Sequence, residues 1–283
     1  MPGSPSSSVQ EARRAIADRL REIRKDAGLS GHALATSAGW YKSKVSRLEN
    51  AVTPPSAEDI RAWCRACRAD DQAADLLAAA RSADTMYVEW RRVQRSGLRR
   101  LQQSYLPLYE RTKVFRTYCS NVVPGVLQTH AYATALLRSI SEFHQTPDDV
   151  AAAVEARLDR SARVVRMGDH RFALVLEESV LRHRVGDAEI MAGQLGYLLS
   201  AMTFPSISLG VIPFAGERRM WMTETFTVYD EEQAEAELLT ARVNVTAPSE
   251  VTQYLRAFRE FSRLAVYGAE ARALITAAVD ALE

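Results

Sequence analysis

Basic and hydroxyl side chains of the kind that contact nucleotides are concentrated between Lys42 and Arg47, where the chain runs Lys-Ser-Lys-Val-Ser-Arg. Arginine and lysine donate hydrogen bonds to the O6 and N7 acceptors of guanine, and a serine hydroxyl donates or accepts. Val45 and Leu48 are three residues apart, so a helix over this stretch can be anchored by one side. The basic side then stays exposed, and the pattern indicates a helix suited to the major groove of DNA.

A second short helix is expected just before this one. Ser30 is a good N-cap residue, and Ala33, Leu34 and Ala38 follow it at the spacing of one helical face. Gly39 then interrupts the pattern where a sharp turn must fall, since glycine adopts backbone conformations that other residues avoid. Short helical hairpins with a basic face also occur in helical proteins that bind no nucleic acid, so this pattern alone leaves both interpretations open.

The twelve residues GWYKSKVSRLEN, numbered 39–50, resemble the turn and recognition helix of the lambda-repressor-like helix-turn-helix family, also called XRE. Similarity to the actinobacterial branch of that family rests on Gly39, Trp40, the run 43–47 and Glu49. The resemblance covers a five-helix unit. It implies a DNA-binding domain at residues 10–83 that binds double-stranded DNA, with helix 41–50 in the major groove.

The same resemblance implies roles for single residues. By position, Lys42, Ser43 and Arg47 would face base edges, where a good bidentate contact discriminates by about 1–3 kcal/mol. Lys44 and Asn50 would meet phosphates, which set the register of a protein on DNA without reading its sequence. One recognition helix reads only a few base pairs, so we also expect a homodimer on two half-sites about one helical turn apart.

Other positions concern the frame that holds the recognition helix. Arg24 and Glu49 stand where the family often has an ion pair between the first and third helices, and two unrelated surface charges are the alternative. Tyr41 replaces the usual Ser or Thr cap of the recognition helix, which weakens the start of that helix. Ala51 replaces a frequent helix-ending glycine, so we expect Asn50 to take the left-handed conformation instead.

Charge is distributed unevenly along the 283 residues, although the net charge is only +1. Residues 1–117 hold 21 Lys and Arg against 13 Asp and Glu, whereas residues 118–283 hold 15 against 22. A basic first part and an acidic second part are typical of a nucleic-acid module fused to a domain of another kind.

The second part of the chain mixes both types of secondary structure. Strands are expected at 114–119, 172–177, 207–213 and 226–229, with residues 236–245 ambiguous, and helices occur between and after these segments. Apolar and basic residues at helical spacing predict a linker helix at 84–107. The expected fold class is therefore mostly α, with a five-helix domain at 10–83, the linker helix, and an α+β domain at 108–283.

The run Val123–Thr129 followed by Tyr132 and Ala133 resembles the entry motif of the C-terminal domain fused to actinobacterial XRE regulators. That resemblance implies an antitoxin-like regulator, often encoded beside a small partner protein. The expected function is a sequence-specific transcriptional regulator whose second domain serves dimerisation, partner binding or effector binding. The alternatives are an antitoxin-like protein that binds a small partner and regulates its own expression, and a small-molecule-sensing regulator.

The sequence offers little support for an enzyme. It has no phosphate-binding glycine loop and no nucleophile-elbow motif. Cys64 and Cys67 lack the second ligand pair of a zinc site and are expected to be small buried residues. Metal-ligand spacing is also absent from His130, His144, His170 and His183. We expect no catalytic residue, no metal and no cofactor.

Sequence signals for secretion or for insertion into a membrane are also lacking. The first residues lack a basic start and an apolar run, so they do not resemble a signal peptide. No apolar stretch approaches the ~20 residues needed to cross a bilayer. We therefore expect a cytoplasmic protein without membrane contact.

Overall fold

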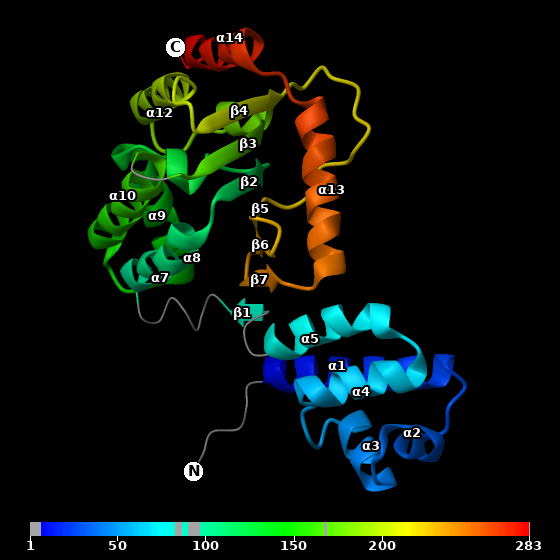
Figure 1. Ribbon diagram of the computed structural model, residues 1–283. Coiled ribbons are helices and arrows are strands. Elements are labelled where there is room, and N and C mark those ends of the chain that lie inside the picture. The colour runs from blue at the N-terminus through cyan, green and yellow to red at the C-terminus, as the bar shows by residue number, and fades with distance from the viewer. Residues whose placement is uncertain (1–6, 83–86, 90–96, 167–168, 283) are drawn as a thin grey trace. The chain divides into compact units, whose positions relative to one another are not determined.

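A computed structural model describes residues 7–82, 87–89, 97–166 and 169–282 of the chain (Figure 1). The chain divides into two compact units. The first unit consists of Met1–Tyr87 together with Asn244–Val251, and the second of Val88–Val243 together with Thr252–Glu283. None of the described helices combines the length and the apolar character that crossing a membrane requires.

The first unit is helical, with five α-helices and one short 3-10 turn among its described residues. These are α1 (Ser7–Asp26), α2 (Gly31–Ala38), α3 (Lys42–Glu49), α4 (Ala57–Cys67), η1 (Asp70–Gln72) and α5 (Ala73–Ser82). Each of the first four α-helices contributes apolar residues to one core, in which Leu20, Leu34, Leu48 and Trp63 are almost fully buried. The Trp63 indole Nε1–H donates to the Leu20 carbonyl at 3.0 Å, which satisfies its only polar group.

Cys64 and Cys67 lie in this core, as the spacing predicts. Burial raises the pKa of both thiols, that of Cys67 to about 11. Both thiols are therefore protonated at neutral pH.

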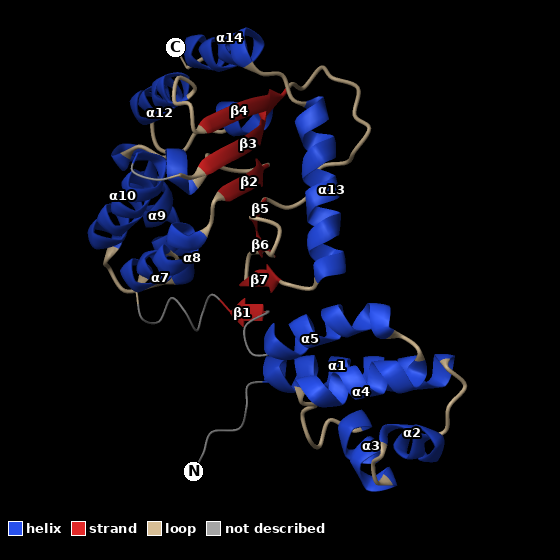
Figure 2. Cartoon of the chain, viewed as in Figure 1, coloured by secondary structure: helices blue, strands red, loops and turns tan. Residues whose placement is uncertain are grey.

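The second unit is built on a sheet whose strand order is β1-β7-β6-β5-β2-β3-β4 (Figure 2). The strands are β1 (Tyr87–Glu89), β2 (Val114–Cys119), β3 (Arg171–Glu177), β4 (Ile207–Ile212), β5 (Phe226–Tyr229), β6 (Gln233–Glu237) and β7 (Ala241–Val245). Strands β2, β3 and β4 pair in parallel, while β5 runs antiparallel to both β2 and β6. The strands expected at 114–119, 172–177, 207–213 and 226–229 are all present.

Helices accompany the sheet along the rest of this unit. They are α7 (Leu98–Ser104), α8 (Leu106–Arg111), η2 (Gly125–Leu127), α9 (His130–His144), α10 (Val150–Arg166), α11 (Glu178–Arg182), α12 (Ala188–Ala201), α13 (Pro248–Leu264) and α14 (Gly268–Asp280). Figure 1 shows α9, α10 and α12 on one side of β2, β3 and β4, with α13 on the other. The expected mostly helical fold with an α+β second domain is confirmed.

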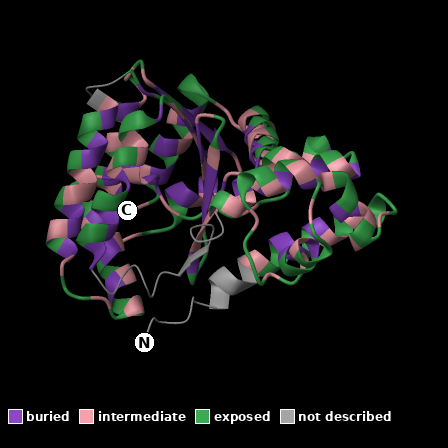
Figure 3. Cartoon of the chain, turned by 60° about the horizontal axis from the view of Figure 1, so that its bottom comes forward, coloured by how far each residue is buried: buried purple, intermediate pink, exposed green. Residues whose placement is uncertain are grey.

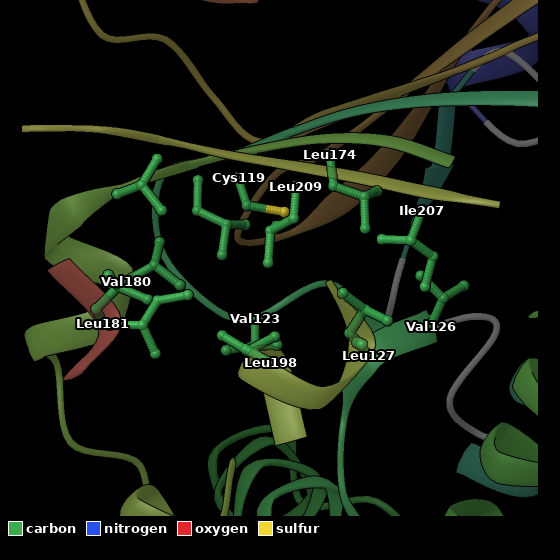
Figure 4. Packing of buried hydrophobic residues seen from close by; sticks show 14 of the residues in the cluster. Cys119, Val123, Val126, Leu127, Leu174, Val180, Leu181, Leu198, Ile207 and Leu209 are labelled. Atoms are coloured by element: carbon green, nitrogen blue, oxygen red, sulfur yellow. The ribbon is translucent and has the colours of Figure 1, made fainter. Parts of the chain in front are cut away.

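Successive side chains of each strand point to opposite faces of the sheet, as the two-residue period of a strand requires. On one face Cys119, Leu174 and Leu209 join the core that includes Leu198 of α12 (Figure 4). On the other face Tyr118 stacks on Phe261 of α13, with ring centroids 3.8 Å apart. Figure 3 shows buried and exposed residues alternating along the helices, as expected of helices that pack one side against a core.

The linker helix expected at 84–107 is not continuous. Residues 87–89 form strand β1, because Tyr87 and Val88 are strong strand formers and β7 is available as a neighbour. Helix α7 begins only after Gly97, whose φ of 89° is closed to most other residues. Residues 83–86 and 90–96 lie outside the described residues.

Asp149 explains why α7 begins where it does. Its carboxylate oxygens accept from the backbone N–H groups of Leu98 and Arg99, each at 2.9 Å. A carboxylate satisfies free amides at a helix N-terminus and complements the helix dipole. The capping residue is about 50 positions further along the chain, so a local pattern could not have shown it.

Candidate nucleic-acid interface

The turn between α2 and α3 is built by residues suited to each position. The Ser30 hydroxyl oxygen accepts from the Ala33 N–H at 3.1 Å and caps α2. Gly39 ends α2 with φ 68° and ψ 32°, the left-handed conformation in which a side chain is strained. Tyr41 precedes α3 in an extended conformation, and its side chain forms no capping hydrogen bond with the described residues. The order of helix, glycine turn and helix matches the expectation.

One side of α3 is fixed in the core, and the other faces solvent. Val45 and Leu48 are each only 2% exposed, while Lys42, Ser43 and Arg47 are exposed. Since successive residues of a helix are rotated by about 100°, the three exposed residues fall within an arc of about 140°. The structure therefore brings the three proposed base-contacting residues together on one exposed surface.

Lys44 lies at the edge of this surface and faces α4 instead. Its ammonium Nζ is 2.5 Å from the Asp59 carboxylate and 4.3 Å from the centre of the Trp40 ring. Asp59 also forms a reciprocal capping box with Ser56, with both hydrogen bonds at 3.1 Å. Partial burial favours the neutral carboxyl, but the hydrogen bonds from Lys44 and Ser56 outweigh it and lower the pKa of Asp59. In the unbound chain Lys44 thus helps to join α3 to α4.

Asn50 remains exposed but is tied down at the end of α3. Its amide Nδ2 donates to the Ser46 carbonyl at 2.7 Å, and its Oδ1 accepts from the Arg21 guanidinium at 3.0 Å. Its φ is −102°, so the expected left-handed conformation at Asn50 is wrong. Ala51 adopts that conformation instead, with φ 54°.

The hydrogen bonds around Ala51 give the physical reason for this correction. The Ala51 N–H donates to the Leu48 carbonyl at 3.2 Å, and the Val52 N–H donates to the Arg47 carbonyl at 3.0 Å. These two bonds form a Schellman motif, which needs a left-handed residue one place beyond the cap. The cap is Asn50, so the strain falls on Ala51.

Arg24 and Glu49 form a two-point ion pair. Arg24 Nε is 2.6 Å from Glu49 Oε1, and Nη2 is 3.2 Å from Oε2. Both side chains are largely buried, at 13% and 11% exposed, and Arg24 also donates to the Leu29 carbonyl at 2.7 Å. The hydrogen bonds to Glu49 raise the pKa of the Arg24 guanidinium. This pair connects α1 to the last residue of α3.

Arg21 is a supporting residue that the sequence pattern did not single out. Its Nη2 donates to the Glu49 carbonyl at 2.6 Å, next to its bond with Asn50. Its position three residues before Arg24 on α1 was the available signal, since such residues share a helix face. Tyr41 also lies at the start of α3 with 85% of its surface exposed, beside Lys42.

Comparison with known families gives two matches. A family model described as a helix-turn-helix domain matches residues 15–77, which contain α2, the Gly39 turn and α3. A second model, described as a domain of unknown function (DUF5753), matches residues 102–277. No curated protein and no solved structure matches the chain.

Proposed function

Because the chain belongs to the family of the domain of unknown function DUF5753 and carries a helix-turn-helix domain ahead of it, we propose that it is a sequence-specific DNA-binding transcriptional regulator. The observation that carries this proposal is the exposed polar surface of α3, with Lys42, Ser43 and Arg47 on one arc and a buried anchor on the opposite side. The regulator needs no catalytic group or cofactor, and its proposed place of action is the cytoplasm.

In the proposed mode, α3 lies in the major groove, which is about 12 Å wide and admits a helix. Arg47 presents a planar guanidinium that can donate two bonds to O6 and N7 of one guanine. Lys42 donates as a point charge, and Ser43 adds a hydroxyl that suits more than one base. The Arg24–Glu49 pair and the Leu48 anchor hold the helix rigid, so little ordering cost remains to be met on binding.

Asn50 and Lys44 are the proposed phosphate contacts. Asn50 is exposed at the end of α3. Lys44 would share or leave Asp59 to reach a phosphate, and the Asp59 carboxylate would keep its hydrogen bond from the Ser56 N–H. Because the Asp59 carboxylate and the phosphate are both anions, the Lys44 ammonium would be paired with an anion before and after binding.

A single α3 reads too few base pairs to define an operator, so the proposal includes a homodimer on an inverted repeat. The resemblance to antitoxin-like regulators adds a small partner protein as a possible ligand of the second unit. Dimerisation on DNA and binding of a small partner protein are compatible, because the partner could bind the regulator while the regulator occupies its operator.

The experiment that tests the proposal is selection of bound fragments from random duplex DNA, with the full-length chain at physiological salt. Enrichment of an inverted repeat is expected, with half-site centres about one helical turn or a multiple of it apart. Enrichment of a single half-site would retain DNA reading and reject the dimer. Recovery of unselected sequences only would overturn the proposal of sequence-specific binding.

A further inference from the structure

The second unit contains a cavity of about 530 Å³. Side chains of β2, β5 and β6 line it together with residues of α7, α9 and α10. Its volume falls within the range of about 300–1,000 Å³ that is typical of small-molecule sites. Every lining residue lies between Leu98 and Leu239, so the cavity belongs to the second unit alone.

Two arginines from one side of α10 line this cavity. Arg157 donates from Nε to the Gln102 side-chain oxygen at 3.1 Å and from Nη1 to that of Gln128 at 2.6 Å. Arg160 donates from Nη1 to the Gln102 backbone carbonyl at 2.7 Å. Its guanidinium lies 4.6 Å from the centre of the Tyr109 ring, which places it against an aromatic face.

The hydrogen bonding of Arg160 is incomplete. The side chain is 95% buried, yet its Nε has no hydrogen-bond partner among the residues that the structure describes. Within that same part of the chain, no carboxylate forms an ion pair with Arg157 or Arg160. A buried charged group without a paired anion is unfavourable, and an unmet donor adds to the cost. An anionic hydrogen-bond acceptor in the cavity would pair with the buried charge and would also accept a hydrogen bond from the Arg160 Nε.

Two glutamates of β6 also line the cavity, and they do not cancel this charge. Glu235 is held 3.6 Å from Arg242 Nε, and burial raises the pKa of Glu235 to about 7. Glu237 is exposed, and loss of solvation raises its pKa although the nearby Arg157 and Arg242 act to lower it. With three arginines against two carboxylates, the surroundings carry an excess positive charge even when both glutamates are ionised.

The remaining wall is largely apolar. Phe115 comes from β2, while Leu137 and Ile140 come from α9. An occupant must therefore combine one anionic group with an apolar body. A monoanion suits the small positive excess better than a dianionic phosphate, which the two glutamates would repel.

We propose that this cavity binds a small amphipathic carboxylate, with the carboxylate on Arg157 and Arg160 and the apolar body against Phe115, Leu137 and Ile140. Arginine fits this role because its planar fork of donors matches the two oxygens of a carboxylate. The Arg160 Nε then gains an acceptor. The site gives the second unit the effector class that a small-molecule-sensing regulator would require.

The test compares 6-phenylhexanoate with its neutral amide by isothermal titration calorimetry on the full-length protein at pH 7.5. The two probes have nearly the same size and apolar surface and differ in charge. The carboxylate is expected to bind, and the amide to bind at least tenfold more weakly. Equal affinities, or no binding of either probe, would overturn the proposal.

Variants locate the binding site. Arg160→Met is expected to reduce binding of the carboxylate to the level of the amide. The matched control is Arg163→Met on the same helix, which removes an arginine that is 50% exposed and pairs with Asp159. Ile140→Trp should weaken binding of both probes by filling the cavity. Carboxylate binding that is the same in Arg160→Met and Arg163→Met would reject the proposed site.

The outcome does not depend on how well Arg160→Met folds, because the comparison of acid and amide uses the wild-type chain. The assay contains no DNA, so a failure here and a failure of the proposed DNA-binding function are visible separately.

Discussion

Arg24 holds the Glu49 carboxylate through two hydrogen bonds, of 2.6 and 3.2 Å, and thereby ties α1 to the end of α3. Because both side chains are largely buried, Arg24→Met would leave the Glu49 carboxylate, among the described residues, with only the longer contact to Arg21 Nε, at 3.8 Å. We expect the free energy of unfolding of the first unit to fall by about 2–3 kcal/mol. Denaturant unfolding of the full chain measures it. Arg14→Met, an exposed position on the same helix, is the control, and an equal loss in the two variants would contradict the structural role.

Arg47→Ala should weaken specific DNA binding without affecting the fold. Arg47 is exposed on α3, so no core contact is lost, whereas a bidentate base contact contributes about 1–3 kcal/mol of discrimination. The expected loss of operator affinity is about 5- to 150-fold. Titration of the selected operator at one fixed salt concentration measures it, with Arg14→Ala as the charge-matched control. Unchanged affinity would remove Arg47 from the base-contacting set.

The salt dependence of binding tests the assignment of Lys44. The wild-type affinity should fall with salt at a log–log slope of about −0.9 for each phosphate that is neutralised. If Lys44 leaves Asp59 for a phosphate, Lys44→Gln should reduce the slope by about one such unit. Lys42→Gln provides a comparison within the same helix. A slope that Lys44→Gln leaves unaltered would mean that Lys44 stays with Asp59 in the complex.

Ala51→Gly should stabilise the first unit. Ala51 has φ 54°, a conformation that costs an alanine about 1–2 kcal/mol and a glycine almost nothing. Glycine loses more chain entropy on folding, so a net gain of about 1 kcal/mol in the free energy of unfolding is expected. Ala62→Gly, inside α4, should have the opposite sign and cost about 1 kcal/mol. A loss of stability at both positions would show that the left-handed turn is relaxed in solution.

Glu235 predicts a pH dependence of stability in the second unit. Its pKa of about 7 in the folded chain exceeds its ordinary value of 4.5, so the folded state binds more protons than the unfolded state between these limits. Stability should therefore fall as the pH rises from 4.5 to 7 and stay low above it. Glu235→Gln should remove this fall and be the more stable protein at pH 8, by a few kcal/mol at most.

Unfolding measured at pH 5 and pH 8 tests this dependence. Glu231→Gln is the control, because the Glu231 side chain is 72% exposed. Identical pH profiles for the wild type and Glu235→Gln would show that Glu235 titrates normally.

Local signals made much of the fold predictable. Ser30 and Gly39 mark the two ends of α2 through their own capping chemistry, and Ser56 with Asp59 forms a capping box over three residues. The main strands were visible as runs of β-branched and aromatic residues. Each of these features depends on neighbours within a few positions, so the order of residues is enough to show it.

The features that were missed depend on residues far apart in the chain. Asp149 caps a helix that begins about 50 positions earlier, and Lys44 of α3 is paired with Asp59 of α4. The cavity needs the two α10 arginines together with β6, a strand that lies mostly before the segment 236–245 that the sequence left ambiguous. Such groups come together only in the folded chain, and a single sequence does not show which distant residues become neighbours.

Gln102 already accepts one hydrogen bond from each of the two arginines that are proposed to hold a carboxylate. Its side-chain oxygen accepts from Arg157, and its backbone carbonyl accepts from Arg160. A ligand that used these two donors as well as the Arg160 Nε would displace Gln102, and the measured affinity would then be the difference between two sets of hydrogen bonds. Since Gln102 is part of α7, displacing it would also break hydrogen bonds that join this short helix to α10.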